Sequence, residues 1–519
     1  MLAQLIRIAP AREQNRRFLN AACIGLLLAY FLHFALPALR AGFGEDEMMN
    51  LHSYWFPGAL RSVRQNFCFW SISYPQRPAG ALYYLPLYHF FLLDPLPYRV
   101  VQISILAATI PIFFYLAALL SGSRAVAFLV TLAMCYHQEL ANLVFGGSFI
   151  YDVLCGLFYF AALTYYVRIR EQGVTLHAGQ LAIFLALYIC ALNSKEMAVS
   201  LPVIVFTYEA LKCPRRTEWK QFALRNWSAT VPTLIAGLVT AIFIYAQLNS
   251  PYSLAHLEAY RPVFSWHRFS LTNAHFINEL LYDSASGIGR AILVAWPIVF
   301  LYAFWRRDRL LQLMAFWVVI TPLPLAFIPA RGGAMLYIVL FGWAMIVAGL
   351  LKDVIGLVGR VPSLSAPRTV MLRTLTTAVV AVALAVFTHW QSHRFNRTRD
   401  LVNSGQKSLH VIQALRSLNL QPAPGSTILL QPKTRFYQNG YYPSFVASLV
   451  WKDRSLRIYV AGQPQLTQEQ IANMNYIISF NEFSAQVVRG AGVQSFLTSL
   501  VRMAALHYDY PSSTATAEE

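Results

Sequence analysis

The chain is 519 residues long, 57% hydrophobic and only 12% charged. A soluble protein carries about 25% charged residues, and apolar runs of about twenty residues, the length that crosses a bilayer core, recur along this sequence. The composition therefore excludes an ordinary soluble domain and indicates an α-helical polytopic membrane protein. The formal net charge of +18 does not indicate a nucleic-acid partner, because the basic residues are distributed between the apolar runs.

The apolar runs predict about eleven transmembrane helices, each long enough to cross a bilayer with some tilt. The four arginines before the first run belong to a cytoplasmic N-terminus, residues 1–17, that we expect to stay uncleaved. The expected spans cover residues 18–40, 98–120, 125–145, 149–167, 178–193, 197–211, 228–247, 286–305, 309–328, 333–351 and 372–390.

The distribution of Lys and Arg orients these helices. Cytoplasmic loops of membrane proteins are enriched in basic residues, and alternate loops between the expected spans of this chain carry clusters of Lys and Arg. The opposite short loops, at 146–148, 193–196 and 330–333, have no such clusters, and their few charges, Lys195, Glu196 and Arg331, need an explanation. We therefore expect a bacterial inner-membrane protein whose opposite, extracytoplasmic side carries its longer loops and its C-terminal domain.

Two outer connections are long, at residues 41–97 and 248–285. The first contains segments with the character of amphipathic helices that lie at the membrane surface. After the transmembrane domain, residues 18–390, the composition changes to that of a small periplasmic α/β domain over 391–510, followed by a disordered tail over 511–519. The strands expected in this domain are the runs STILLQ, FVASLVW, LRIYVA and NYIISF.

The densest negative charge follows the first apolar run. Glu45, Asp46 and Glu47 stand in the stretch AGFGEDEMMNLHSYW, a few residues beyond the expected membrane boundary. A solvated loop is the simpler explanation of such a triplet. The other explanation is a polar site on the outer side of the membrane, and the remaining outer loops favour it.

Each short outer loop brings ionisable or polar side chains to that same side. Ionisable groups near a bilayer are costly unless they face partners or a cavity, so their recurrence suggests a polar cavity that opens outward. Simpler roles stay open: an ion pair for Lys195, snorkelling to headgroups for Arg331 and a satisfied buried histidine for His137. The residues are His137, Glu139, Asp152, Lys195, Glu196, Arg331 and Tyr337.

The order of these motifs resembles the GT-C superfamily of glycosyltransferases, over residues 20–350. The pair Glu45-Asp46 after the first span is similar to that superfamily's acidic signature, in which two aspartates are more usual. HQEL at 137–140, Asp152, SKEM at 194–197 and the stretch from Arg331 to Tyr337 are similar to elements of the protein O-mannosyltransferases and of the transmembrane and tetratricopeptide-repeat O-mannosyltransferases. Those repeats are not found in this sequence, so protein O-mannosylation does not carry over.

The resemblance implies a hexosyl- or mannosyl-transferase-like reaction in which an acceptor hydroxyl attacks the anomeric carbon of a polyprenyl-phosphate-linked sugar. Asp46 is then the expected base, with Glu45 as its partner. Arg331 and Lys195 are expected to bind the donor phosphate, and His137, Glu139, Asp152, Glu196 and Tyr337 to shape the site. No cofactor is certain. A divalent metal is left open, with Asp46, His137, Glu139 and Asp152 as ligands if they converge.

The expected partners are the lipid-linked sugar donor, membrane lipids and an acceptor that is a protein, a lipid or a polysaccharide. A transporter or flippase for a lipid-linked glycan is the main alternative, although no paired repeats or interrupted helices favour it in the sequence. A non-enzymatic membrane scaffold is a third reading, and it gives the charged residues no purpose. The identity of the sugar stays open.

Overall fold

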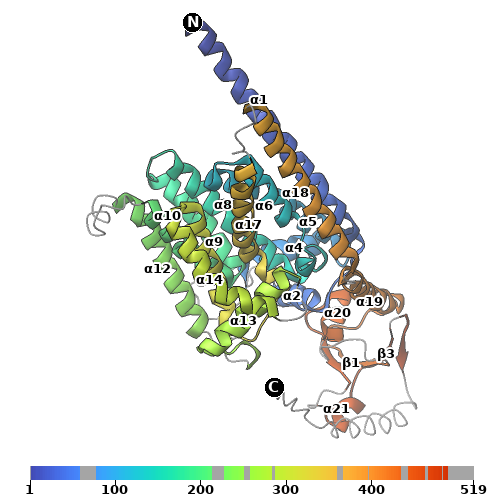
Figure 1. Cartoon of the computed structure of the whole chain (residues 1–519). Coiled ribbons are helices and arrows are strands. Elements are labelled where there is room, and N and C mark those ends of the chain that lie inside the picture. The colour runs from blue at the N-terminus through green and yellow to red at the C-terminus, as the bar shows by residue number, and fades with distance from the viewer. Residues whose placement is uncertain are drawn as a thin grey trace. The chain divides into compact units, whose positions relative to one another are not determined.

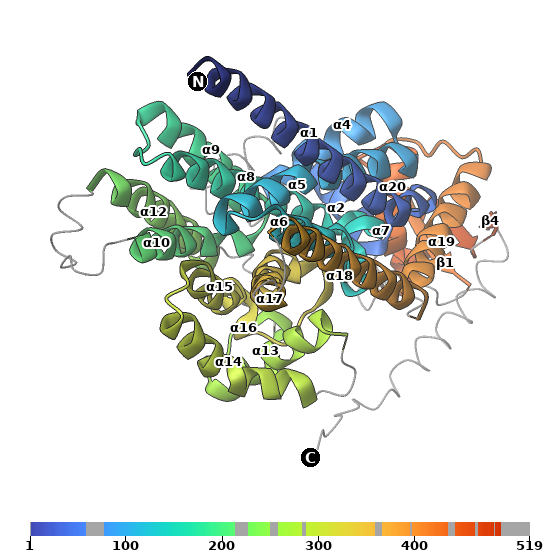
Figure 2. The same cartoon turned by 45° about the horizontal axis from the view of Figure 1, so that its top comes forward.

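The computed structural model of the chain is mainly helical, with one small sheet near its C-terminal end (Figures 1 and 2). By their contacts the residues form two compact units, the first from 1–40, 60–83 and 97–401, the second from 41–59, 84–96 and 402–519. The structure describes residues 2–58, 77–212, 227–249, 258–282, 287–358, 366–394, 397–433, 442–461, 466–481 and 483–488. The expected tail at 511–519 lies outside these ranges.

The first unit contains most of the helices. In chain order they are α1 (Leu2–Ala35), α4 (Pro78–Phe91, shared with the second unit), α5 (Pro95–Ser121), α6 (Arg124–Cys135), α7 (Asn142–Phe145), α8 (Ile150–Glu171), α9 (Ala178–Ser194), α10 (Leu201–Lys212), α12 (Trp227–Asn249), α13 (Trp266–Leu280), α14 (Gly287–Trp305), α15 (Arg309–Ile320), α16 (Leu323–Ala326), α17 (Tyr337–Val358) and α18 (Ala366–Arg394). Short 3-10 turns, η1 (Leu36–Arg40), η2 (Gln138–Leu140), η3 (Gly147–Phe149), η4 (Glu196–Ser200), η6 (Glu258–Tyr260) and η7 (Gly333–Leu336), join several of them.

Seven helices of the described chain are long and apolar enough to cross a membrane. They are Arg17–Arg40, Pro95–Ser121, Gly147–Glu171, Ala229–Asn249, Arg309–Ala326, Gly333–Gly356 and Val370–Arg394. Each overlaps one of the eleven expected spans, so the chain is a helical membrane protein by this measure. The other four expected spans correspond to α6, α9, α10 and α14, which are not among these seven. The expected span 125–145, for example, is interrupted because the backbone becomes extended at Tyr136, directly after α6.

The core of the first unit is aromatic. Trp317 on α15 is fully buried against Phe160 of α8 and Phe341 of α17, and its indole nitrogen donates a hydrogen bond to the Ile338 carbonyl at 2.9 Å. Gly342 of α17 allows this helix to approach α15 closely, because a Cβ at this position would overlap the Trp317 ring. This packing holds α8, α15 and α17 together in the helix core.

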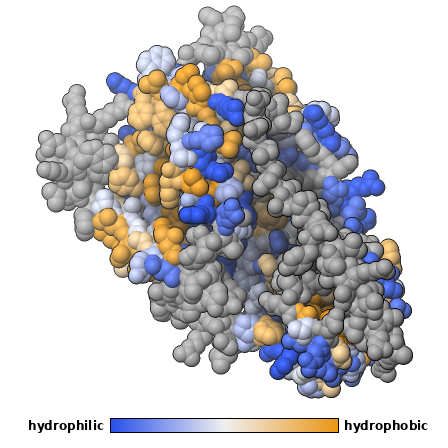
Figure 3. Space-filling view, turned by 90° about the horizontal axis from the view of Figure 1, so that it is seen from below, coloured by the Kyte–Doolittle hydropathy of each residue, from blue (hydrophilic) through white to orange (hydrophobic). Residues whose placement is uncertain are grey.

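Outside this core, large apolar side chains are exposed. Val294 and Leu301 on α14, and Val370 and Val382 on α18, are each more than 60% exposed. Figure 3 shows hydrophobic residues beside hydrophilic ones on the face seen from below. Exposed apolar surface of this extent marks an interaction site, and on α18, which is long and apolar enough to cross a bilayer, its natural partner is lipid.

The second unit contains a four-stranded sheet in the order β2-β1-β3-β4. Its strands are β1 (Thr427–Pro432), β2 (Arg457–Val460), β3 (Tyr476–Phe480) and β4 (Ala485–Val488), and its helices are α2 (Glu45–Trp55), α19 (Arg397–Ser417), α20 (Tyr442–Trp451) and α21 (Gln468–Ala472). Strand β1 is parallel to both β2 and β3, with Leu429 opposite Tyr459 on one side and Ile477 on the other. Strand β4 pairs antiparallel with β3.

One strand prediction in this domain is wrong. The run FVASLVW forms most of helix α20, not a strand. A short continuous apolar run does not distinguish a buried strand from a buried helix, and the parallel pairing of β1 with β2 requires a crossover connection, usually a helix. Helix α20 lies between these two strands in the sequence and supplies that crossover.

Parts of the first long outer connection belong to the second unit by their contacts. Helix α2 packs against α20, and the Tyr88 hydroxyl of α4 donates a hydrogen bond to the Leu449 carbonyl at 2.6 Å. Gly42 lies against Gly405 so closely that a Cβ on either residue would overlap the other's backbone. The second unit is therefore built from 41–59 and 84–96 as well as from the C-terminal segment.

Candidate functional site

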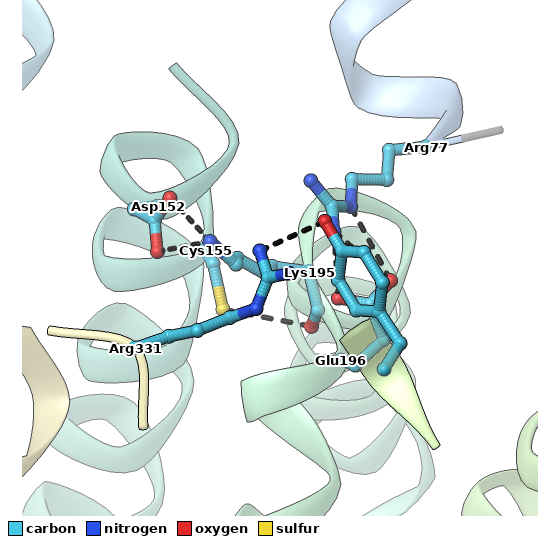
Figure 4. A network of polar contacts seen from close by, with 7 residues as sticks. Arg77, Asp152, Cys155, Lys195, Glu196 and Arg331 are labelled. Carbon is cyan, nitrogen blue, oxygen red and sulfur yellow. Dashed lines mark hydrogen bonds and ion pairs between the residues drawn. The ribbon is translucent and has the colours of Figure 1, made fainter. Parts of the chain in front are cut away.

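Charged residues of the first unit meet where its helices begin and end. Asp152 lies in the first turn of α8, Lys195 directly follows α9, and Glu196 begins η4. Arg77 precedes α4, and Arg331 precedes η7. Figure 4 draws these five residues, together with Cys155, as one network of polar contacts.

The centre of this network is a buried ion pair. The Lys195 ammonium lies 2.6 and 2.5 Å from the two carboxylate oxygens of Asp152, and both side chains are only 5% exposed. Lys195 reaches Asp152 because α9 ends at Ser194, after which the backbone becomes extended. The Cys155 thiol donates to the Lys195 carbonyl at 3.8 Å and holds this segment against α8. The positive charge of Lys195 is thus compensated within the protein.

A second ion pair is more open to solvent. Arg77 lies 3.1 Å from a carboxylate oxygen of Glu196, and its guanidinium stacks over the Tyr151 ring at 4.9 Å. Burial by itself would raise the pKa of Glu196, but the charge of Arg77 and the neighbouring donors hold that pKa below its ordinary value. Glu196 is therefore a carboxylate at neutral pH.

Arg331 is oriented by an aromatic partner. Its Nη1 donates a hydrogen bond to the Tyr260 hydroxyl at 2.9 Å, and its guanidinium carbon lies 3.7 Å from the centre of the Tyr260 ring. Stacking of this kind fixes the plane of the guanidinium. A planar, oriented guanidinium is the geometry that binds a phosphate or carboxylate through two parallel hydrogen bonds.

The backbone after Arg331 is fixed by Glu279 of α13. The Gly333 N–H donates to Glu279 Oε2 at 2.7 Å. Gly333 has a φ of +70°, and a Cβ on Gly332 would overlap the Glu279 carboxylate, so both positions require glycine. His275 lies 3.3 Å from the same carboxylate, and the hydrogen bond to Glu279 raises the pKa of His275. Glu279 is thus the residue that positions the Arg331 turn.

The other three predicted residues of this unit have mainly packing roles. The Tyr337 hydroxyl lies 3.3 Å from the Thr109 hydroxyl inside the helix core. His137 Nε2 is 3.1 Å from the Leu280 carbonyl, and its ring stacks on Tyr282 with centroids 4.3 Å apart. Glu139 lies in η2, which packs against η7 and so supports the Arg331 turn from a second side.

The acid triplet forms the first turn of α2, in the second unit. Glu47 is fully buried and accepts a hydrogen bond from the Gly44 N–H at 3.3 Å, whereas Asp46 is exposed. Negative charge at a helix N-terminus is favourable because it complements the helix dipole. The position of the triplet is therefore explained by the start of a helix and not by a solvated loop. The roles expected for Asp46 and Glu45 in the reaction stay predictions.

Within the described residues, no group of three or more His, Cys, Asp and Glu side chains is close enough to hold a metal ion. Of the expected ligand set, Asp152 is bound to Lys195 and His137 to the Leu280 carbonyl. The described side chains therefore do not bring together the four residues that were left open as metal ligands.

Three residues of the site were not predicted: Arg77, Tyr260 and Glu279. The glycine pair 332–333 was a usable signal, since adjacent glycines often mark a close approach of the backbone to another group. Glu279 is also the one acid in the amphipathic stretch that became α13. No feature of the sequence indicates Tyr260.

The fold and the site together define a helical membrane protein with a network of charged side chains at the ends of its helices. No protein-family model matches this sequence, and no curated protein matches it. The resemblance to the GT-C superfamily therefore depends on the motifs quoted above.

Proposed function

We propose that the chain is an integral-membrane glycosyltransferase that moves a sugar from a polyprenyl-phosphate donor to an acceptor hydroxyl on the extracytoplasmic side. The observation that carries the proposal is the network of Arg77, Asp152, Lys195, Glu196 and Arg331, gathered at the helix ends of a mainly apolar unit. Ionisable groups in such a setting are costly and usually functional. The proposal includes eleven membrane spans, a location in the bacterial inner membrane, and an orientation with the N-terminus in the cytoplasm.

Arg331 is the proposed phosphate ligand. As the acceptor oxygen bonds to the anomeric carbon, the bond from that carbon to the phosphate oxygen breaks and negative charge grows on the leaving lipid phosphate. A preoriented cation stabilises this charge without reorganisation, and Tyr260 supplies the orientation. The sequence predicted that Lys195 binds the donor phosphate. In this proposal Lys195 instead stays paired with Asp152, and Glu196 stays paired with Arg77.

The acceptor proton needs a base. Asp46, with Glu45 as its partner, stays the proposed base, and the exposure of Asp46 leaves its carboxylate accessible to an acceptor hydroxyl. The second unit, which includes α2, is proposed to help select the acceptor. Deletion of residues 391–519 would test this poorly, because it would also remove the partners of α2 and Tyr88.

The proposal is tested with purified protein and a panel of polyprenyl-phosphate sugars, with donor binding and consumption followed by mass spectrometry. We expect Arg331→Gln to lower turnover by about two to three orders of magnitude. The matched control is Arg306→Gln, which removes an equal charge from the more exposed pair with Asp353 and should leave turnover unchanged.

Asp46→Asn is the second variant in this assay. Donor that is bound by both proteins but consumed only by the wild type would support Asp46 as the base. Equal turnover would retain the enzyme and discard the base, whereas failure of the wild type to bind any donor would favour the flippase or scaffold alternatives.

A further inference from the structure

Two histidines lie on one face of α18, near its C-terminal end. His389 and His393 are the first and last residues of the stretch HWQSH, and residues four apart in a helix are neighbours on its surface. Their Nε2 atoms are 3.2 Å apart, and the planes of the two rings meet at 73°. Both residues are exposed. The pair is separate from the charged network around Arg331, so the proposed transfer does not account for it.

The separation of these two nitrogens is that of two ligands on one metal ion. Histidine nitrogens bind Zn²⁺ at about 2.0–2.1 Å, so two of them that subtend an angle between about 90° and about 109° at the ion are about 2.9–3.4 Å apart. The observed 3.2 Å lies within this interval. Two histidines four residues apart on a helix also form the zinc-binding pair of the metalloprotease helix. An ion can therefore bind both rings with little movement of either.

The hydrogen bond between the two rings determines what binding of an ion requires. Without an ion, one Nε2 carries a proton and donates it to the lone pair of the other Nε2. With an ion, the donating ring carries its proton on Nδ1 instead and stays neutral. Both Nε2 lone pairs then bind the ion, which takes the place of the shared proton. Binding therefore needs a change of tautomer in one ring and no net loss of a proton.

A third histidine lies beside the pair. His33 is in the last turn of α1, and the centre of its ring is 5.8 Å from that of His389. In the described part of the chain, no three His, Cys, Asp or Glu side chains are close enough together to hold a metal ion. His33 is therefore a neighbour of the pair and not a third ligand, and the remaining positions on the ion are left to water.

We propose that His389 and His393 together bind a divalent transition-metal ion of the Zn²⁺ and Cu²⁺ class. Imidazole nitrogens suit these ions, whereas Mg²⁺ and Ca²⁺ prefer oxygen ligands. The glutamate that acts as the base in the metalloprotease helix has no counterpart in HWQSH, where Trp390 follows the first histidine. The ion is therefore bound without hydrolytic chemistry, and it links two successive turns at the end of α18.

The test is calorimetric titration of Zn²⁺, Cu²⁺ and Mg²⁺ into the full-length protein, purified in detergent without a polyhistidine tag. We expect Cu²⁺ to bind more tightly than Zn²⁺ and Mg²⁺ not to bind at this pair. His393→Ala removes one of the two ligands and should weaken Zn²⁺ binding by at least about tenfold. His267→Ala, at an exposed histidine of α13, is the matched control and should leave the affinity unchanged. His33→Ala should weaken binding by less than about threefold.

A second measurement uses the wild-type protein and so does not depend on the folding of a variant. Pulsed electron paramagnetic resonance of bound Cu²⁺ should show coupling to two imidazole rings. Coupling to fewer than two, or equal Zn²⁺ affinity in His393→Ala and wild type, would overturn the proposal and leave only a hydrogen-bonded pair. A loss in His33→Ala as large as that in His393→Ala would overturn the two-ligand arrangement. Neither measurement uses a sugar donor, so the outcome is independent of the proposed transferase.

Discussion

At the scale of single residues, burial of the pair of Lys195 and Asp152 gives both residues a structural role. From the sequence, Lys195 is either a cation for phosphate or half of an ion pair, and the structure pairs it with Asp152 at 5% exposure. Removal of one partner of a buried pair leaves an uncompensated charge, which costs about 3–5 kcal/mol. The pair therefore holds the start of α8 against the end of α9, whatever its part in catalysis.

We expect Lys195→Met to lower the thermal midpoint of the purified protein strongly, and the double variant Asp152→Leu with Lys195→Met to recover much of the loss. Arg306→Gln, which breaks a more exposed pair, should cost at most about 1 kcal/mol. Thermal unfolding in detergent measures all three. A midpoint for Lys195→Met equal to that of wild type would contradict the burial argument.

The turn after Arg331 gives a second prediction. Gly332→Ala forces a Cβ into the Glu279 carboxylate, so the turn must shift and Arg331 with it. Turnover should then fall toward the level of Arg331→Gln. Gly237→Ala in α12 is the control, because a Cβ there meets nothing within 4 Å and alanine favours the helix by about 0.5–1 kcal/mol. Donor consumption is the readout, and wild-type turnover in Gly332→Ala would refute the positioning role of Glu279.

His275 makes the stability of this turn depend on pH. Because Glu279 raises the pKa of His275 in the folded state, the pair stabilises the protein fully below the ordinary histidine pKa of about 6.5. The stabilisation is lost as the pH rises through the raised value. We expect the gap in thermal midpoint between wild type and His275→Asn to be larger at about pH 5.5 than at about pH 8.5. A gap independent of pH would argue against the pair.

At the scale of elements, α2 joins the first outer connection to the C-terminal sheet. His52 of α2 is packed against Phe445 of α20 with ring centroids 5.0 Å apart, and burial lowers the pKa of His52 to about 4. In the unfolded chain His52 takes up a proton near pH 6.5, so unfolding is favoured progressively as the pH falls from about 6.5 to about 4.

We therefore expect the second unit to lose stability in that pH window, and His52→Phe to reduce the loss. Limited proteolysis of the second unit across this pH range measures the effect. His410→Phe, on α19 of the same unit, is the matched histidine control. The same acid sensitivity in His52→Phe as in wild type would assign it to other groups.

At the scale of the whole molecule, the number of crossings decides which side the network faces. If all eleven expected spans cross, a reporter inserted after Gln172 lies in the cytoplasm and one inserted after Leu418 lies outside. Alkaline phosphatase, which is active only outside, should thus be inactive at the first position and active at the second. Activity at both positions would reject the eleven-span topology.

The sequence by itself determined the helical membrane class, because apolar runs of bilayer length need no tertiary contact to be recognised. It also indicated that polar residues gather in the short outer loops, since charge in an apolar chain stands out. Strand and helix could not be separated in FVASLVW, where hydrophobicity has no periodicity.

Only the tertiary structure decided the partners. Asp152 and Lys195 are 43 residues apart, and Arg77 and Glu196 are 119 apart, so no local pattern joins them. Glu279 and Tyr260 likewise reach the Arg331 turn because distant segments pack together. Ion pairs and aromatic stacking depend on distances in space, which the order of residues along the chain does not contain.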